Sequence, residues 1–348
     1  MTTPSTNKGV LVGISGGVDS AVCCMLLKDA GYEVSALYCV MSERHLAGIA
    51  AAETTAEELG IRLHTVDLRE EFKASVIIPF ADSYTAGKTP NPCVVCNPKV
   101  KFRNLAATAE KLGAARIATG HYARIAELGG KRVIQRAADI KRDQSYMLYR
   151  LNQDALRNLL FPLGHKTKAD VRTLAKAAGL SSALSPDSQE ICFIPDADYV
   201  KYIHSLGRYG MAGNFISPDG KNLGPHEGVE CYTPGQRKGL GLNLGRPVFV
   251  KRILENGDIL LSDLGGEYAS EVIISELSIN PVFDMENEKN LSVKLRSASV
   301  PAFADVTIEK DAAKLSFRVP QRAPAPGQSA VIYRDDLLVG GGVITDFC

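Results

Sequence analysis

A glycine-rich turn between an apolar strand and a helix constrains this chain more than any other part of its sequence. Residues Gly9–Ile14 are largely apolar, Ser15–Gly17 supply the turn, and a helical pattern covers Ala21–Ala30. Backbone N–H groups in such a turn can approach an anion closely, because glycine has no Cβ, and the helix dipole favours negative charge there. The sequence therefore predicts a phosphate-binding loop. It lacks the Gly-Lys-Ser/Thr ending of a Walker A motif, so this element supplies no lysine to the phosphates.

Apolar, β-branched runs alternate with helical patterns over the first 120 residues. This order is typical of a parallel sheet flanked by helices, so we expect an α/β domain with a helix after each of its first three strands. Gly31, Gly60 and Gly113 follow helical patterns, where a left-handed cap favours glycine. The expected strands are Gly9–Ile14, Glu33–Cys39, Ile61–Asp67 and Arg116–Thr119.

The remaining chain changes character about two thirds of the way along. Thr167 and Asp170 stand at the spacing of a capping box, and from Gly213 onward only short apolar runs occur between turn residues, which indicates mostly β structure. We therefore predict an N-terminal parallel-sheet domain at residues 1–205, a small, mostly β central domain at 206–268 and a β-barrel-like domain at 269–348. Further expected elements are a hairpin of Ala123–Glu127 and Arg132–Arg136 around Gly129-Gly130, and helices at Asp154–Leu160 and Thr167–Gly179.

Composition places the chain among ordinary globular proteins, with 45% hydrophobic and 23% charged residues and a net charge of +1. No apolar run approaches the roughly 20 residues of a membrane-spanning helix, and Met1–Lys8 lacks the order of a signal peptide. We therefore expect a cytoplasmic protein with no membrane partner. In a reducing compartment, grouped cysteines point to catalysis or metal binding rather than to disulfides.

The element Ser-Gly-Gly-Val-Asp-Ser at Ser15–Ser20 resembles that of the PP-loop ATP pyrophosphatases, which cleave ATP between the α- and β-phosphates. The resemblance implies ATP and Mg²⁺, with Ser15 and Ser20 holding the pyrophosphate and Asp19 organising the metal-bound phosphates. The alternative is a tight turn in which Asp19 or Ser20 caps the helix. The implied ATP-binding residues are Gly13, Ile14, Ser15, Gly16, Gly17, Val18, Asp19, Ser20, Cys39 and Gly120. Like Cys23 and Cys24, Cys39 also fits a buried small hydrophobe.

Further segments resemble the tRNA-specific 2-thiouridylases, in the order of that family and across nearly the whole chain. The resemblance implies ATP-dependent 2-thiolation of a wobble uridine in tRNA: the C2 oxygen is adenylated and then replaced by sulfur, with release of AMP. The segments are Thr89–Asn97, Ala118–Arg124, Asp143–Tyr146, Asp187–Ile194, Gly235–Leu240 and Pro326–Ala330.

The sulfur-transfer pair of that family corresponds here to Cys96 and Cys192. A persulfide on Cys192, received from a sulfur-relay protein, would attack directly or be reduced by Cys96, and either route leaves a disulfide that a reductant resets. One alternative is an iron–sulfur cluster held by Cys93, Cys96 and Cys192; another makes Cys93 and Cys96 half of a zinc site. We favour the persulfide route, in which the cysteines bind no metal.

The resemblance also implies a tRNA surface. Asn91, Pro92 and Cys93 would line the pocket of the flipped base, since C2 is hard to reach within a stack. His121 would contact tRNA, although a histidine bonded to backbone is the simpler interpretation. Lys131, Lys141 and nearby arginines form a local cationic excess; Lys99, Lys101 and Arg103 add to it or form a solvated helix face. The implied contacts are completed by Arg142, Asp143, Gln144, Arg296 and Gln328.

The chain departs from the family where Cys93 replaces an aspartate of many members and where the loop Val40–His45 is short. Two other interpretations stay open. An amidotransferase-type PP-loop ligase would have no use for the cysteine motifs, and an inactive RNA-binding module would have no use for the intact loop at Ser15–Ser20. ATP–pyrophosphate exchange in the presence of tRNA separates that module from an enzyme.

Overall fold

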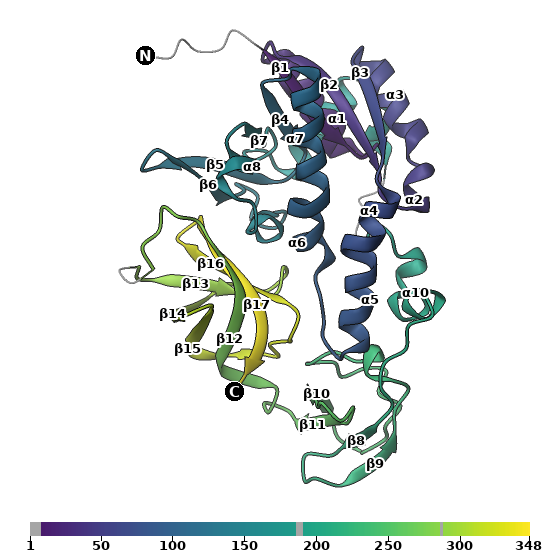
Figure 1. Ribbon diagram of the computed structural model, residues 1–348, viewed down its shortest axis with the longest axis vertical. Helices are drawn as coiled ribbons and strands as arrows, with labels where there is room; N and C mark the ends of the chain where they lie inside the picture. The colour runs from purple at the N-terminus through teal and green to yellow at the C-terminus, as the bar shows by residue number, and fades with distance from the viewer. Residues whose placement is uncertain (1–7, 186–190, 286–287) are drawn as a thin grey trace. The chain divides into compact units, whose positions relative to one another are not determined.

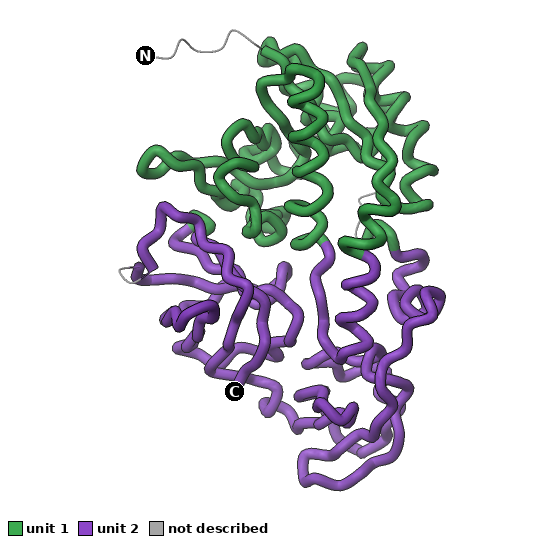
Figure 2. Tube along the Cα trace, viewed as in Figure 1, with its two compact units in different colours: residues 1–76, 93–193, 336–338 green, residues 77–92, 194–335, 339–348 purple. Residues whose placement is uncertain are grey.

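The computed structural model describes residues 8–185, 191–285 and 288–348, so residues 1–7 and the motif residues Asp187–Glu190 lie outside the described part (Figure 1). The chain forms two compact units (Figure 2). Unit 1 comprises Met1–Val76, Cys93–Phe193 and Asp336–Leu338, and unit 2 comprises Ile77–Pro92, Ile194–Asp335 and Val339–Cys348.

Unit 1 is built on a parallel sheet, as predicted. Its strands are β1 (Gly9–Ile14), β2 (Glu33–Val40), β3 (Arg62–Asp67), β4 (Arg116–Thr119) and β7 (Leu159–Leu160), in the order β3-β2-β1-β4-β7. The winding therefore reverses between β1 and β4. Ligands of open α/β sheets bind beyond the carboxyl ends of strands at such a reversal, which is where the glycine-rich turn follows β1.

Helices pack on this sheet through apolar side chains that include Cys23 and Cys24, both fully buried as expected for small hydrophobes. The α-helices of this part of the chain are α1 (Val18–Asp29), α2 (Glu43–Leu46), α3 (Ile49–Leu59), α4 (Arg69–Phe72), α6 (Pro92–Cys96), α7 (Phe102–Leu112), α8 (Gln153–Leu156) and α9 (Lys168–Ala177). Two π-helical segments, Lys73–Ile77 and Asn97–Lys101, and two 3₁₀ turns, Ser145–Leu148 and Ser181–Leu184, accompany them.

Most local predictions for unit 1 are confirmed. Gly60 and Gly113 end their helices with φ of 58° and 70°, and Thr167 forms a capping box with Asp170. The hairpin consists of β5 (Ala123–Leu128) and β6 (Lys131–Arg136). The predicted helix Asp154–Leu160 is wrong beyond Leu156, because the next two leucines pair with β4 as strand β7.

Unit 2 begins with α5 (Ile78–Thr85) and continues with a 3₁₀ turn (Pro195–Ala197) and α10 (Tyr199–Ser205). A small sheet follows, with order β10-β11-β8-β9, whose core holds Phe215, Tyr232 and Leu240. Its strands are β8 (Asn214–Ile216), β9 (Asn222–Pro225), β10 (Val248–Ile253) and β11 (Ile259–Asp263), with a 3₁₀ turn at Val229–Cys231.

A closed barrel completes unit 2. Its strands follow the order β12-β15-β14-β13-β16-β17, and β17 pairs back onto β12. They are β12 (Tyr268–Ile279), β13 (Leu291–Lys294), β14 (Ala302–Glu309), β15 (Ala312–Arg322), β16 (Ser329–Arg334) and β17 (Leu337–Phe347). The predicted fold class is confirmed: a parallel α/β domain, a small β domain and a β-barrel.

Candidate active site

The loop after β1 has the geometry of an anion cradle. Gly16 has φ of +76°, and a Cβ on it would lie 3.0 Å from Cβ of Ala51, so glycine is required there. Ser20 Oγ accepts a hydrogen bond from Ser15 N (3.2 Å) and donates one to Gly17 O (3.0 Å). These two bonds to the loop's own backbone stabilise the turn. Helix α1 begins at Val18 with Gly17 as N-cap and no side-chain cap, so the alternative of Asp19 or Ser20 as a cap is wrong.

Asp19 carries the loop's negative charge and is held by two side chains from distant parts of unit 1. Lys168 Nζ lies 2.7 Å from both carboxylate oxygens, and the Tyr122 hydroxyl donates to Oδ1 at 2.7 Å. Lys168 is the first residue of α9, directly after the N-cap Thr167. Sequence reasoning missed this lysine: the capping box places the helix start, but nothing local shows that it reaches residue 19.

Gly120 follows β4 and touches the loop. A Cβ on Gly120 would lie 3.0 Å from the Asp19 carbonyl carbon and 3.1 Å from Ser20 N. Cys39 lies near the end of β2, at the same sheet edge, and burial raises the pKa of its thiol to about 11. Gly13 and Ile14 end β1. These predicted ATP-binding residues therefore share one edge of the sheet, while their contacts with ATP stay a prediction.

Four cysteines gather near the same edge, since Cys39, Cys93, Cys96 and Cys192 interact electrostatically. Cys93 and Cys192 are exposed and Cys96 is buried, and none of the three forms a disulfide within the described residues. Desolvation raises the pKa of Cys96 to about 12 and that of Cys192 to about 11. Cys96 Sγ also lies 3.9 Å from Met41 Sδ. Both members of the predicted sulfur-transfer pair thus belong to unit 1, and both are mainly protonated thiols.

The two metal alternatives require at least three of these side chains to converge on one point. Within residues 8–185, 191–285 and 288–348, no three His, Cys, Asp or Glu side chains are grouped so that they could hold a metal ion. Among these described residues, therefore, Cys93, Cys96 and Cys192 are not grouped as a set of three metal ligands.

His121 is bonded to a side chain rather than to backbone, so the simpler interpretation of it is wrong in detail. Its Nδ1 lies 2.8 Å from Thr119 Oγ1, and its ring stacks on Phe102 at 5.8 Å between centroids. Burial, with a contribution from Lys101, lowers the pKa of His121 to about 3. The imidazole is therefore neutral, and any contact with RNA would be a hydrogen bond or a stacking contact.

The predicted tRNA residues at positions 142–144 lie between β6 and the turn at Ser145–Leu148. Asp143 accepts bonds from Ala137 N (3.0 Å) and from the Ser145 hydroxyl (2.8 Å), and Gln144 Oε1 accepts from Tyr122 N (2.9 Å). Both side chains therefore shape the loop internally. Arg142 is exposed and is the better candidate for a phosphate contact. Arg132 instead donates to the carbonyls of Leu156 and Leu159, so it stabilises the fold.

The whole chain is similar in sequence to known protein families and to individual relatives. The family description "tRNA methyl transferase HUP domain" matches residues 8–196, "tRNA methyl transferase PRC-barrel domain" matches 203–263, and "Aminomethyltransferase beta-barrel domain" matches 270–344. The tRNA-specific 2-thiouridylase MnmA 2 of Clostridium tetani is 39% identical over 97% of this chain and 98% of its own length. MnmA of Clostridium perfringens is 39% identical over 97% and 99%.

The chain belongs to the tRNA-specific 2-thiouridylase family. Solved structures resemble it more distantly: the tRNA thiolase NcsA of Methanococcus maripaludis, with its iron–sulfur cluster, has a TM-score of 0.38, is 19% identical and covers 58% of this chain and 66% of its own. The NMN synthetase of Francisella tularensis has a TM-score of 0.36, is 18% identical and covers 56% of this chain and 72% of its own.

In the described ranges, none of the helices combines the length and apolar character needed to cross a membrane.

Within unit 2, two motifs of this thiouridylase family meet. Thr89 N donates to Pro326 O at 2.7 Å, and Gly327, with φ of +92°, packs so closely on Thr89 that a Cβ would lie 2.9 Å from its nitrogen. The segment leading to Asn91 and Pro92 is therefore bonded to the loop that carries Gln328. Arg296 donates to Pro234 O (2.8 Å) and Ala323 O (3.1 Å), so its guanidinium also braces this unit.

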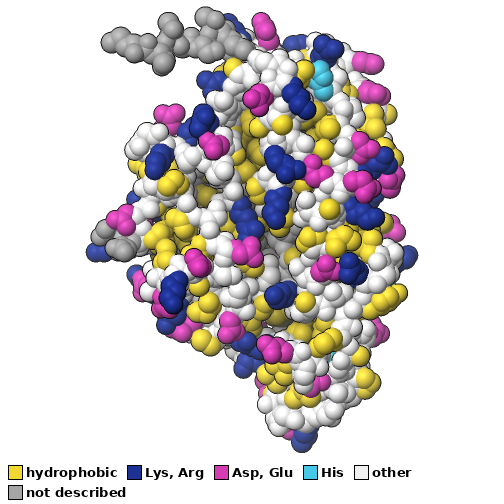
Figure 3. Space-filling model, viewed as in Figure 1, with side chains coloured by type: hydrophobic (Ala, Val, Ile, Leu, Met, Phe, Trp, Pro, Cys, Tyr) yellow, Lys and Arg dark blue, Asp and Glu magenta, His cyan; other side chains and the backbone are white. Residues whose placement is uncertain are grey.

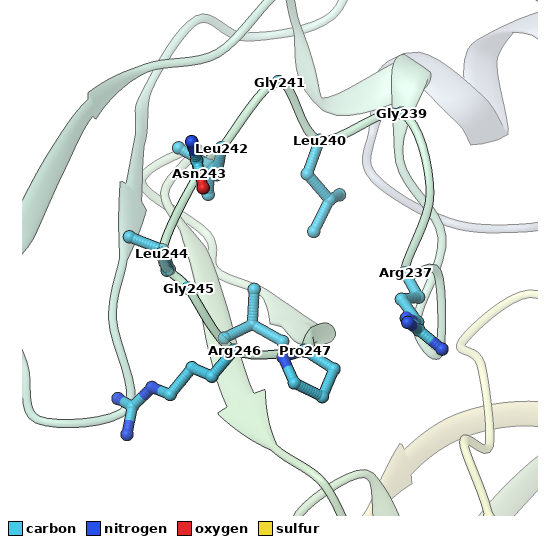
Figure 4. A pocket seen from close by; sticks show the side chains of 11 residues that line it. Arg237, Gly239, Leu240, Gly241, Leu242, Asn243, Leu244, Gly245, Arg246 and Pro247 are labelled. Atoms are coloured by element: carbon cyan, nitrogen blue, oxygen red, sulfur yellow. The ribbon is translucent and has the colours of Figure 1, made fainter.

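Residues of the family motif Gly235–Leu240, together with the segment that follows up to Val248, line a cavity of about 400 Å³ in unit 2 (Figure 4). Leu240 points into it, while Arg237 and Arg246 lie on opposite sides. Arg246 Nε lies 3.3 Å from Asp263.

On the face of the molecule shown in Figure 3, Lys and Arg side chains gather near α7 of unit 1. Arg103 there is paired with Glu71 at 2.5 Å.

Proposed function

We propose that this sulfurtransferase acts on tRNA by ATP-dependent 2-thiolation of the wobble uridine, with Cys96 and Cys192 as the sulfur-transfer pair. The observation that supports this most is the presence, in one unit, of a phosphate-type loop with a salt-bridged aspartate and a pair of interacting thiols. A ligase of the amidotransferase type would not use the thiols, and an RNA-binding module would use neither feature.

In the proposed adenylation, the uridine C2 oxygen attacks the α-phosphate of ATP and pyrophosphate leaves. The loop N–H groups and the start of α1 would hold the pyrophosphate, since both favour anions. Lys168, with a side chain only 12% exposed, would supply the cation that the loop itself lacks. Asp19 suits Mg²⁺, which prefers oxygen ligands and commonly binds a carboxylate together with substrate phosphates. When bound, the metal neutralises phosphate charge.

In the proposed sulfur transfer, the Cys96 thiolate attacks the inner sulfur of a persulfide on Cys192. The S–S bond of the persulfide breaks, a Cys96–Cys192 disulfide forms, and hydrosulfide leaves with the electron pair. Hydrosulfide then attacks C2 of the adenylated uridine and expels AMP. A persulfide donor protein loads Cys192 beforehand, and a thiol reductant returns the disulfide to two thiols. The tRNA contacts would come from the predicted residues in both units, and the setting would be the cytoplasm.

The test uses the purified chain with tRNA transcript, ATP, Mg²⁺ and a persulfide donor. We expect 2-thiouridine by nucleoside mass spectrometry and ATP–pyrophosphate exchange that depends on tRNA. Asp19→Ala should lose both, whereas Cys96→Ser should lose only the thiolated product. Exchange without any thiolated nucleoside in the wild type would favour a ligase, and no exchange would favour a binding module. Thiolation at the wild-type rate in Asp19→Ala would contradict the proposed role of the loop.

A further inference from the structure

Lys101 lies close enough to the four clustered cysteines to interact with each of them electrostatically, and its sequence position indicated no role in sulfur chemistry. It interacts electrostatically with Cys96, Cys93, Cys192 and Cys39, which come from three separate segments of unit 1. Lys101 is only partly exposed, whereas Lys99 is exposed. The interpretation of Lys101 as part of a solvated helix face is therefore wrong.

A π-helical turn directs Lys101 to this position. The segment Asn97–Lys101 is π-helical, and Phe102 N donates to Asn97 O, five residues earlier. In a π-turn, residues five apart lie on one face, so Lys101 aligns with Cys96, whereas an α-helix would align Val100 with it. Val100 and Phe102 are buried, with exposed fractions of 0% and 1%. The extra residue thus keeps the apolar neighbours in the core and leaves the lysine beside the thiols.

The ammonium group has no carboxylate counter-ion within the ranges that the structure describes. The nearby Glu71 is paired with Arg103 (2.5 Å) and accepts a bond from Asn104 (3.0 Å). His45 and His121 both have a lowered pKa, mainly through burial and partly through Lys101, so they are neutral. A cation withdrawn from water without a partner is costly, and an anion that forms beside it gains in proportion.

We propose that Lys101 is the counter-ion of the sulfur anions in this site, a positioning residue that stabilises the Cys96 thiolate and the sulfur carried by Cys192. This inference rests on the proposed function for its purpose but not for its test. Desolvation raises the pKa of both thiols, and the Lys101 charge opposes that increase; the thiols in turn raise the pKa of Lys101. Arg44 adds a second, weaker positive contribution at Cys192.

The experiment measures thiol reactivity in the resting protein, without ATP or tRNA. The exposed Cys192 is alkylated with iodoacetamide over a range of pH and quantified by peptide mass spectrometry, in wild type, Lys101→Met, Lys101→Gln and Lys101→Arg. One pKa unit is a tenfold change in thiolate fraction below the pKa. We expect alkylation to slow by roughly tenfold in the Met and Gln variants and to recover in the Arg variant. Lys111→Met, an exposed lysine at the end of α7, is the matched control and should behave as wild type.

Single-turnover thiolation and ATP–pyrophosphate exchange are measured on the same proteins. In Lys101→Met and Lys101→Gln, the rise of the thiolation rate with pH should shift to higher pH. The rate of ATP–pyrophosphate exchange should not change. Unaltered alkylation in Lys101→Met and Lys101→Gln would overturn the proposal. If ATP–pyrophosphate exchange were lost in the same variants, Lys101 would act at a phosphate instead. If one neutral variant does not fold, the other decides. A changed alkylation profile in a protein that makes no 2-thiouridine would refute only the proposed function.

Discussion

Replacing Gly120 by alanine tests whether the end of β4 sets the position of the phosphate loop. The new Cβ would lie 3.0 Å from the Asp19 carbonyl carbon, 3.1 Å from its oxygen and 3.1 Å from Ser20 N. Backbone atoms cannot rotate away as a side chain can, so the loop must shift by a few tenths of an ångström. Overpacking of this kind costs about 1–3 kcal/mol. Because about 1.4 kcal/mol is a factor of ten in affinity, we expect ATP binding to weaken by roughly tenfold.

Calorimetric titration with Mg²⁺ and a non-hydrolysable ATP analogue measures this loss, and urea unfolding measures stability. Gly113→Ala is the control, because Gly113 has φ of +70° but nothing within 4 Å of its added Cβ. Backbone strain should lower its unfolding free energy by about 1–2 kcal/mol. Its affinity for the analogue should not change. Wild-type affinity in Gly120→Ala would refute the argument that β4 supports the loop.

Three further predictions concern other parts of the site. Cys93→Ser, purified without oxygen, should retain single-turnover thiolation from a persulfide donor; joint loss of bound iron and activity would instead support a cluster. Arg142→Ala should reduce the slope of log affinity for tRNA against log salt by about 1, and an unchanged slope would exclude a phosphate contact. Thr167→Ala should lower the unfolding free energy by about 1 kcal/mol through loss of the capping box, as measured in urea, and unaltered stability would contradict that role.

Sequence patterns predicted the elements whose cause is local. β1 is a continuous apolar run. The left-handed conformation at position 113 favours glycine, and Thr167 caps its helix through Asp170, three residues later. The strand Leu159–Leu160 was missed because two leucines fit a helix equally well until β4 offers them partners. Local propensity gives way to tertiary pairing in such short segments.

The site was predictable in its residue types but not in its charge partners. Motifs predicted the loop Ser15–Ser20 and the pair Cys96 and Cys192, whose roles stay predictions. Lys168 meets Asp19 across 149 residues of sequence, and no periodicity encodes that distance. Lys101 was misjudged because a π-turn has the same composition as an α-helix, while its register differs by one residue.

The salt bridge between Asp19 and Lys168 also bears on which anions the loop accepts. With the two charges paired at 2.7 Å, the resting loop is neutralised from within and offers little net attraction to a stray phosphate or sulfate. An incoming group must separate the pair and give each member a new partner of opposite sign. In the proposed ATP site, a nucleotide with its divalent cation would do both at once, because its phosphates would pair with Lys168 and Asp19 would hold the metal. A simple anion would offer a new partner to Lys168 alone, so the proposed loop would bind it more weakly than the nucleotide with its metal.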